Sequence, residues 1–285
     1  MALGLEPLSE LLLPDETTVE EHDVVTDRDV LVGGQSTVEF GVRGRNVVAG
    51  ERVQFGGHIE AAGDCRLDMW CHVADNVLVE RDAYLGERVS IDGRLVVSGD
   101  LDIGDDVQIA EGFEANGWIV IRNPMPTIVF LFIYLTQLLH LGEEAAAEEL
   151  LDELDEENSN DGSDPLCIPR GARVGDDTWE VGTPATIGAG CRLHGNIRAT
   201  TIAVGADTEI FGSLRARGDV TVASDARIHG DVTTRRGDVA LAPGVEVLGD
   251  VACHDLLLSP DAHVDGTIQA GGTVRIDDDA RTPPE

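Results

Sequence analysis

The stretch LGERVSIDGRLVVSGDLDI (residues 85–103) decides the fold, because its apolar residues recur at short, regular intervals. Leu85 is followed by apolar residues 4, 6, 10, 12 and 16 positions further on, at Val89, Ile91, Leu95, Val97 and Leu101. Within each short run, apolar and polar residues alternate, which is the period of a strand with one buried face. Gly or Asp interrupts every run after a few residues, so no strand is long enough for an ordinary sheet.

The same pattern repeats in both halves of the chain. In the first half it begins at Ala49, Leu67, Leu85 and Ile103, and a slightly shorter turn begins at Val32. In the second half it begins at nearly constant spacing, at Ile187, Val204, Val222, Leu241 and Leu258. Strands stacked about 4.8 Å apart at this period would align the apolar positions as inward ladders. The repeat therefore predicts an all-β chain of two parallel β-helix (β-solenoid) domains, at residues 30–123 and 167–279.

One position of the repeat is glycine in every turn of the second half. At the same place after each starting position stand Gly195, Gly212, Gly230, Gly249 and Gly266, whereas the first half has Gly57, Asp75, Gly93 and Glu111. This pattern predicts a tight corner where only a small residue or a positive φ fits. The first half is expected to form the same corner less tightly.

The five cysteines include no C-x-x-C pair. Cys65, Cys71, Cys191 and Cys253 fall on ladder positions that small or aliphatic residues such as Val and Ala occupy in neighbouring turns. We therefore expect them to be small buried hydrophobic residues rather than metal ligands or redox groups. No basic leader with a cleavage site is evident, which favours a reducing cytoplasm.

The charge balance is extreme: 54 acidic and 20 basic residues give a formal net charge of −34, and every basic residue is arginine. A carboxylate-rich, lysine-free surface indicates a cytoplasm at molar salt, where screening limits self-repulsion to about 3 Å. The same charge argues against a nucleic-acid partner, because phosphate binding requires a basic surface.

An apolar then acidic segment, residues 124–157, separates the two repeat arrays, and a polar linker follows at 158–166. The sequence predicts an α-helical insertion whose apolar run, at 127–141, is shorter than the roughly 20 residues that span a bilayer. Three interpretations stay open: a cap on a solenoid end, an in-plane membrane anchor and a true span. The residues concerned are Ile128, Phe130, Leu131, Phe132, Tyr134, Leu135, Leu138 and Leu139. Residues 1–29 form an N-terminal segment, whose apolar start is expected to cap the first turn, and 280–285 form a tail.

The corner motifs at Gly230–Thr234 and Gly249–Cys253, within these short turns, resemble those of the bactofilins. The resemblance is closest over residues 187–276 and weaker over 32–121. It implies a three-sided, right-handed β-helix that assembles into filaments without nucleotide, often at the membrane, as a scaffold or in cell shape. It also implies a cytoplasmic protein at the inner face of the membrane, with itself or a related polymer as partner. The duplicated array and the insertion depart from the family's usual single array.

A β-helix has two terminal turns with unpaired backbone groups and an exposed apolar layer, so another solenoid can add to either end. Head-to-tail contacts would give a polar filament, and isologous contacts a non-polar one. We expect the contact surfaces to be the first and last turns, with these residues: Val32, Val38, Val42, Leu258, Val264, Ile268, Val274 and Ile276.

Two other functions stay open. A six-residue register is also visible and resembles the hexapeptide repeats of left-handed β-helix acyltransferases, which need a histidine base. His194 and His229 share an outward position, but Phe211 and Leu248 occupy it in neighbouring turns, so surface histidine is the simpler interpretation. An adaptor that binds proteins on its flat faces and modulates a related polymer is the third possibility. The sequence indicates no catalytic, cofactor-binding or metal-binding set of residues, and no cofactor.

Overall fold

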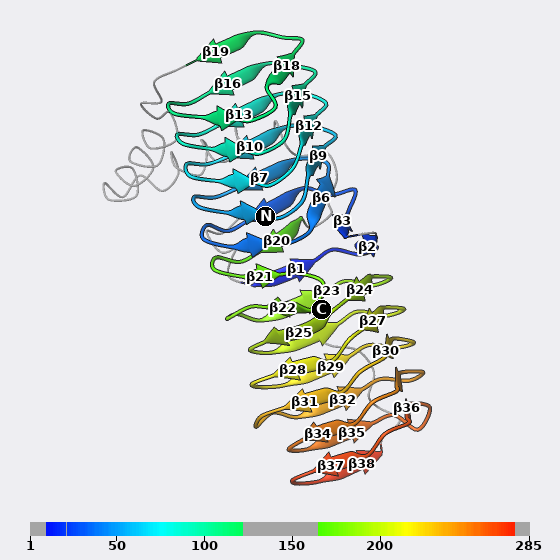
Figure 1. Cartoon of the computed structure of the whole chain (residues 1–285). Helices are drawn as coiled ribbons and strands as arrows, with labels where there is room; N and C mark the ends of the chain where they lie inside the picture. The colour runs from blue at the N-terminus through cyan, green and yellow to red at the C-terminus, as the bar shows by residue number, and fades with distance from the viewer. Residues whose placement is uncertain (1–9, 21, 122–164, 277–285) are drawn as a thin grey trace, which may run out of the picture.

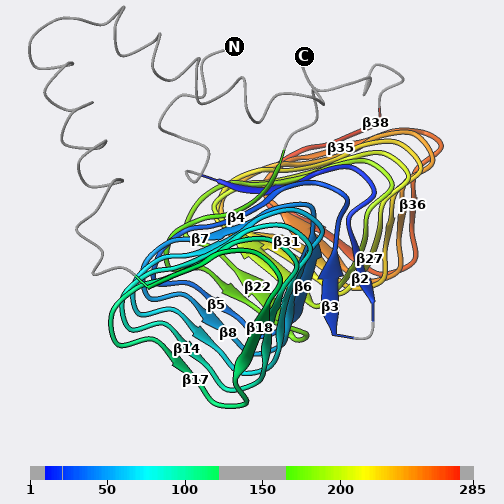
Figure 2. The ribbon, with the colours of Figure 1, turned by 90° about the horizontal axis from the view of Figure 1, so that it is seen from above.

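The computed structural model describes residues 10–20, 22–121 and 165–276, which form one continuous β-solenoid (Figure 1). Three sheets run along the whole rod, one of 14 strands and two of 12. Seen along the rod, successive turns lie over one another around a common core (Figure 2). The predicted fold class is confirmed, and ladders of aliphatic side chains make up most of its core. The predicted helical insertion at 124–157 lies outside the described residues.

Sheet A has 14 strands. Its first-array strands are β4 (Val30–Val32), β7 (Val47–Ala49), β10 (Cys65–Leu67), β13 (Ala83–Leu85), β16 (Leu101–Ile103) and β19 (Ile119–Ile121). Its second-array strands are β23 (Ala185–Ile187), β26 (Ile202–Val204), β29 (Val220–Val222), β32 (Val239–Leu241), β35 (Leu256–Leu258) and β38 (Val274–Ile276). Between the arrays lie β1 (Leu11–Leu13) and β20 (Leu166–Ile168).

Sheet B has 12 strands. The first array supplies β6 (Gly41–Gly44), β9 (Ile59–Ala61), β12 (Val77–Val79), β15 (Leu95–Val97) and β18 (Phe113–Ala115). The second array supplies β24 (Arg192–His194), β27 (Glu209–Phe211), β30 (Arg227–Ile228), β33 (Glu246–Val247) and β36 (His263–Val264). The two central strands are β2 (Thr18–Glu20) and β3 (Asp23–Val25).

Sheet C also has 12 strands. The first array supplies β5 (Thr37–Val38), β8 (Gln54–Phe55), β11 (His72–Val73), β14 (Ser90–Ile91) and β17 (Gln108–Ile109). The second array supplies β25 (Asn196–Ala199), β28 (Leu214–Ala216), β31 (Val232–Thr234), β34 (Val251–Cys253) and β37 (Ile268–Ala270). The two central strands are β21 (Arg173–Val174) and β22 (Thr178–Glu180).

The strand register follows the repeat read from the sequence. In sheet A, Cys65 pairs with Ala83, Ala83 with Leu101, and Leu101 with Ile119, all in parallel. Parallel pairing at a fixed offset places identical repeat positions above one another, so each inward ladder is continuous. The ladders therefore supply most of the core, and Phe40, Phe55 and Trp179 are the large aromatic residues among its described members.

The two arrays meet head to head in the middle of the rod. The central pair β1–β20 is antiparallel, with Leu12 opposite Cys167, whereas every other pair in sheet A is parallel. Strand β1, from the N-terminal segment, stacks on β23 of the second array, and β20 stacks on β4 of the first. The inner end of each array is thus covered by one strand, and that strand comes from the segment that leads into the other array.

A single sequence offset, the step from Leu11 to Leu166, relates the two sides of this joint, and we call it the duplication offset. Leu11 pairs with Ala185, and its equivalent Leu166 pairs in the mirrored position with Val30. The antiparallel hairpins β2–β3 and β21–β22 obey the same offset. So do the hydrogen bonds that Ser36 Oγ donates to Pro169 O (2.8 Å) and that Cys191 Sγ donates to Pro14 O (3.1 Å). The joint has pseudo-two-fold symmetry, so both outer ends of the rod are C-terminal ends of arrays.

The corner glycines are required mainly by close stacking. Only Gly195 of the five second-array residues has a positive φ, of 98°. At Gly212, an added Cβ would lie 2.0 Å from Gly195 O, and at Gly266 it would lie 2.4 Å from Gly249 O. The turn beneath therefore excludes a side chain, because no Cβ can approach backbone so closely. The expectation of a small residue is confirmed, but positive φ explains only one position.

Gly212→Ala is expected to lower the free energy of unfolding by about 2–3 kcal/mol, because the new methyl group must push two turns apart. Denaturant unfolding monitored by circular dichroism measures the change. Gly182→Ala is the matched control, since no atom lies within 4 Å of its added Cβ and its φ is not positive. Equal losses in both variants would contradict the stacking explanation.

Candidate functional site

The three sheets stop at each end of the rod, and there the inward ladders come to the surface. The first-array end is the turn of β17, β18 and β19, and the second-array end is the turn of β36, β37 and β38. Leu101 is fully buried, but Ile119, the next residue of its ladder, is 46% exposed. Likewise Leu256 is 1% exposed and its neighbour Val274 is 50% exposed. Each end is an apolar layer with a free strand edge among the described residues.

Four of the predicted contact residues lie in the last turn of the second array, and the fifth, Leu258, lies directly beneath it on β35. Leu258 and Val264 are half-buried there, and the exposed ones are Ile268, Val274 and Ile276. Their placement matches the expectation that this turn is an open end. Whether they form a contact between chains stays a prediction.

The prediction that the first turn is an open end is wrong. Val32, Val38 and Val42 are at most 2% exposed and lie inside the rod, not at an end. They are covered because Val32 pairs with Ile168, Val38 with Val174 and Val42 with Val24. The chain itself therefore fills the surface that the sequence left open.

The first-array end was missed by sequence reasoning. Its exposed residues include Trp118 (80%), Ile121 (75%) and Phe113 (41%). The repeat had placed Phe113 and Ile119 in inward ladders, without showing that no described turn covers them. A signal was available: Leu11–Leu13 repeats as Leu166–Ile168 at the duplication offset, which identifies the covering strands.

A family model described as bactofilin, polymer-forming cytoskeletal, matches residues 185–283. The second array belongs to the bactofilin family. The matched region begins at β23, the first strand of this array, and includes every later strand. No curated protein and no solved structure shows significant similarity to the chain. The bactofilin domain thus identifies the second array as part of a polymer-forming cytoskeletal protein.

Side chains at the corners link the turns of the bactofilin array and of the first array. Asp219 Oδ1 accepts a hydrogen bond from Asp238 N (2.9 Å), and Asp238 Oδ1 from Asp255 N (3.0 Å). Asp255 Oδ1 in turn accepts from Thr273 N (2.6 Å), which lowers the pKa of this carboxyl group. In the first array the same ladder ends at Trp118, whose N donates to Asp100 Oδ1 (2.7 Å) and whose indole offers no acceptor.

His194 and His229, the candidates for the histidine base of an acyltransferase, lie on the outer face of the bactofilin array. His194 and His229 stack on opposite sides of Phe211, with ring centroids 4.7 and 4.3 Å apart. His229 Nε2 lies 3.0 Å from Glu209 Oε1. The column runs along an outward row of sheet B, so ring stacking and one hydrogen bond account for these side chains. Within the described ranges, no helix could span a bilayer, and no three His, Cys, Asp or Glu side chains form a metal-binding group.

All five cysteines are free and buried, which confirms the expectation for the four assigned to ladders. Burial raises the pKa of Cys65 to about 12, that of Cys71 to about 12 and that of Cys191 to about 11. An uncharged thiol is favoured in the folded state because its thiolate would lose hydration. These thiols serve as small core residues.

The stability of the protein is expected to fall as the pH rises above about 9. The folded pKa of these thiols is raised, so their contribution is complete below the unfolded value near 9 and is lost toward the folded value near 12. Denaturation midpoints measured between these pH values test this. Cys71→Val, which repeats Val53 and Val89 of the same ladder, should flatten the decline. An identical slope in the variant would contradict the assignment.

Proposed function

We propose that the chain is a non-enzymatic scaffold protein that forms filaments by end-to-end stacking of its rods, without nucleotide. The supporting observation is that both ends of the rod expose the apolar ladders that are buried everywhere else along it. Stacking buries these side chains and pairs the free strand edges in the same step. The match of residues 185–283 to a polymer-forming family supports the same function.

The joint inside the chain is a model for the contact between chains. Because both ends are C-terminal ends, continuing sheet A across a contact places antiparallel strands side by side. The pair β1–β20 already joins two arrays in that way. The proposed filament therefore alternates one joint within each chain with one contact between chains, and the arrays reverse direction at each.

The proposal includes association with the inner face of the cell membrane and a role in cell shape. Both are properties of the family that the sequence resembles. The apolar run at residues 127–141 is the candidate attachment segment, and it lies outside the described residues. Vesicle flotation of the chain with and without residues 124–142 distinguishes an anchor from a cap.

Electron microscopy of the purified protein in about 1 M KCl, without nucleotide, tests the filament proposal. At this salt the Debye length is about 3 Å, so repulsion between the acidic ends is largely screened. Filaments are expected. Discrete trimers would favour the acyltransferase, and single rods would favour the adaptor.

A further inference from the structure

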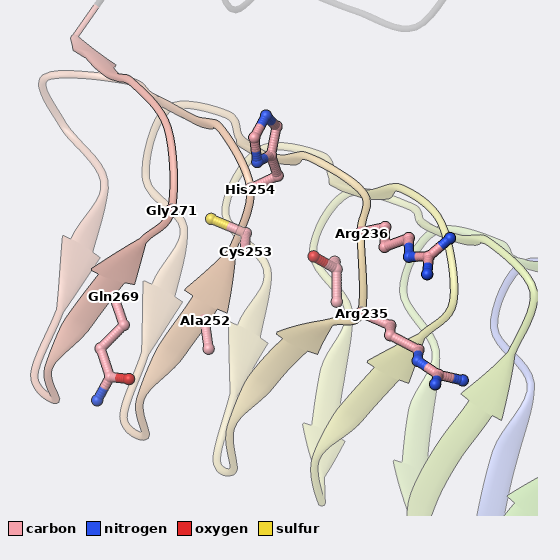
Figure 3. Close-up of a pocket in the computed structure, with 8 residues that line it drawn as sticks. Arg235, Arg236, Ala252, Cys253, His254, Gln269 and Gly271 are labelled. Atoms are coloured by element: carbon pink, nitrogen blue, oxygen red, sulfur yellow. The ribbon is translucent and has the colours of Figure 1, made fainter.

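Five arginines gather on one side of the second array, and we call them the arginine strip. Arg198 and Arg215 are paired neighbours on the outward side of β25 and β28. Arg217, Arg235 and Arg236 follow at the corner between sheets C and A, after β28 and β31. All five are exposed. Figure 3 shows Arg235 and Arg236 extending from their turn beside a shallow hollow that His254 and Gln269 also line.

The strip is not a general property of the repeat. At the duplication offset, the equivalent first-array residues are Arg43, Glu60, Ala62, Glu80 and Arg81. Two arginines and two glutamates make this set neutral, whereas the strip carries five positive charges. In the first array, Arg43 Nε also donates to Glu60 Oε2 (2.8 Å). The second array has thus concentrated a quarter of the chain's 20 basic residues at positions where the same fold tolerates glutamate.

The strip has no partner among the described residues. Arginines on the neighbouring sheet B are paired: Arg192 Nε lies 3.7 Å from Glu209, and Arg227 Nε donates to Glu246 (2.7 Å). None of the five strip residues forms an ion pair with another residue in the described ranges. Guanidinium groups bind carboxylates through several parallel donors. A row of five exposed ones is therefore a surface for an acidic partner.

The last turns of the first array offer acidic residues of the same chain, most of them on the side of sheet A. Residues 95–121 contain no arginine and six acidic residues. Asp100, Asp102, Asp105 and Asp106 lie on β16 and in the corners beside it, whereas Glu111 and Glu114 lie on the sheet B side. Asp106 and Glu114 also form ion pairs, with Arg88 and Arg94. This segment forms the last turns of the first array, in the opposite half of the rod from the strip (Figure 1). One chain cannot bring these two surfaces together, but two rods lying side by side can.

We propose that the arginine strip binds the acidic segment 95–121 of a second copy of this chain, so that rods associate side by side and filaments bundle. Filament bundling rests on the proposed end-to-end assembly, whereas the lateral contact between two rods does not. At about 1 M salt the Debye length is about 3 Å, so charges that do not touch are largely screened. The contacting arginines and carboxylates then determine the interaction, rather than the net charge of −34.

Salt separates the two kinds of contact. End-to-end stacking joins apolar layers that carry excess negative charge, so added salt strengthens it. Lateral binding joins opposite charges, so added salt weakens it. Bundles are therefore expected to separate into single filaments as KCl rises, while the filaments themselves persist.

The test uses the double substitution Arg215→Glu and Arg235→Glu. It gives the second array the glutamates that the first array has at the equivalent positions, Glu60 and Glu80. Sedimentation and electron microscopy are carried out from about 0.3 M to about 3 M KCl. The lateral association constant is expected to fall about tenfold, with filaments intact. Arg192→Gln with Arg227→Gln, which removes two paired arginines, is the control and should bundle normally. Adding Glu60→Arg and Glu80→Arg to the wild-type chain leaves segment 95–121 unchanged and should not reduce bundling.

Unchanged bundling in the Arg215→Glu, Arg235→Glu variant would overturn the proposal, as would bundling that strengthens with salt. Flotation with phosphatidylglycerol vesicles addresses a lipid partner: lost vesicle binding with normal bundling would make the strip a lipid site and overturn the proposal. Failure of the proposed end-to-end assembly can be distinguished from failure of the strip contact. If no filaments form, analytical ultracentrifugation of the full chain still detects lateral pairs of rods. Pairs that dissociate as salt is added support the strip contact. The absence of pairs at every salt concentration refutes it.

Discussion

Trp179→Ala is expected to lower the free energy of unfolding by about 4 kcal/mol. Trp179 is fully buried on β22, at the joint between the arrays. Its ring lies 5.8 Å from that of Phe40, a first-array residue, and its Nε1 donates to His194 O (3.0 Å) in the second array. The substitution leaves a cavity and an unpaired carbonyl group at the point where the two halves share a core.

The measurement is guanidinium unfolding followed separately by tryptophan fluorescence and circular dichroism. Loss of the joint should also separate the transitions of the two arrays, since each turn is stabilised by its neighbours. Trp118→Ala is the matched control, because this indole is 80% exposed at the first-array end. Its unfolding midpoint should stay within the error of the wild type. A comparable loss in both variants would show that the joint is not a special source of stability.

The ladders could be predicted from sequence because the regular period of the repeat fixes both the strand register and the inward side. Cys65, Ala83 and Leu101 share one ladder in the sequence and in sheet A. The joint could not be read in the same way. The hairpins β2–β3 and β21–β22 reverse the chain there, so the fixed period is interrupted.

The N-terminal segment illustrates this limit. The sequence predicted that its apolar start caps the first turn, and Leu11 and Leu13 are indeed fully buried. Their strand, β1, pairs with β23 of the second array, however, because the symmetric joint exchanges the strands that cover the two arrays. Periodicity reports which residues point inward, but it does not report which of two equivalent arrays a strand covers.

The two ends and the arginine strip were hidden for a related reason. Open ends follow from the head-to-head arrangement, so Trp118 and Ile121 could be recognised as surface residues only once the direction of the first array was known. The strip emerges when the arrays are compared at the duplication offset, where Glu60 corresponds to Arg215. Net charge alone indicated a uniformly acidic chain and concealed the basic side.

Val274→Arg is expected to limit assembly to particles of at most two chains, whereas the wild type forms filaments. Val274 is 50% exposed on β38 and belongs to the ladder of Leu256, so a contact between chains would bury it. An arginine there would bring an unpaired guanidinium group into an apolar layer, which costs several kcal/mol. Ile268→Arg, on β37 of the same turn, should act in the same way. Electron microscopy and analytical ultracentrifugation in about 1 M KCl measure particle length.

The number of chains per particle then shows which ends meet. Particles of two chains mean that like ends pair, because the first-array ends can still join, and single chains mean that unlike ends pair. Ile119→Arg blocks the first-array end, and together with Val274→Arg it should leave single rods in both cases. Leu248→Arg is the control, since this residue is 38% exposed on the bactofilin array but precedes its last turn. Long filaments from the doubly substituted chain would disprove end-to-end stacking, because no unmodified apolar end would be left to join them.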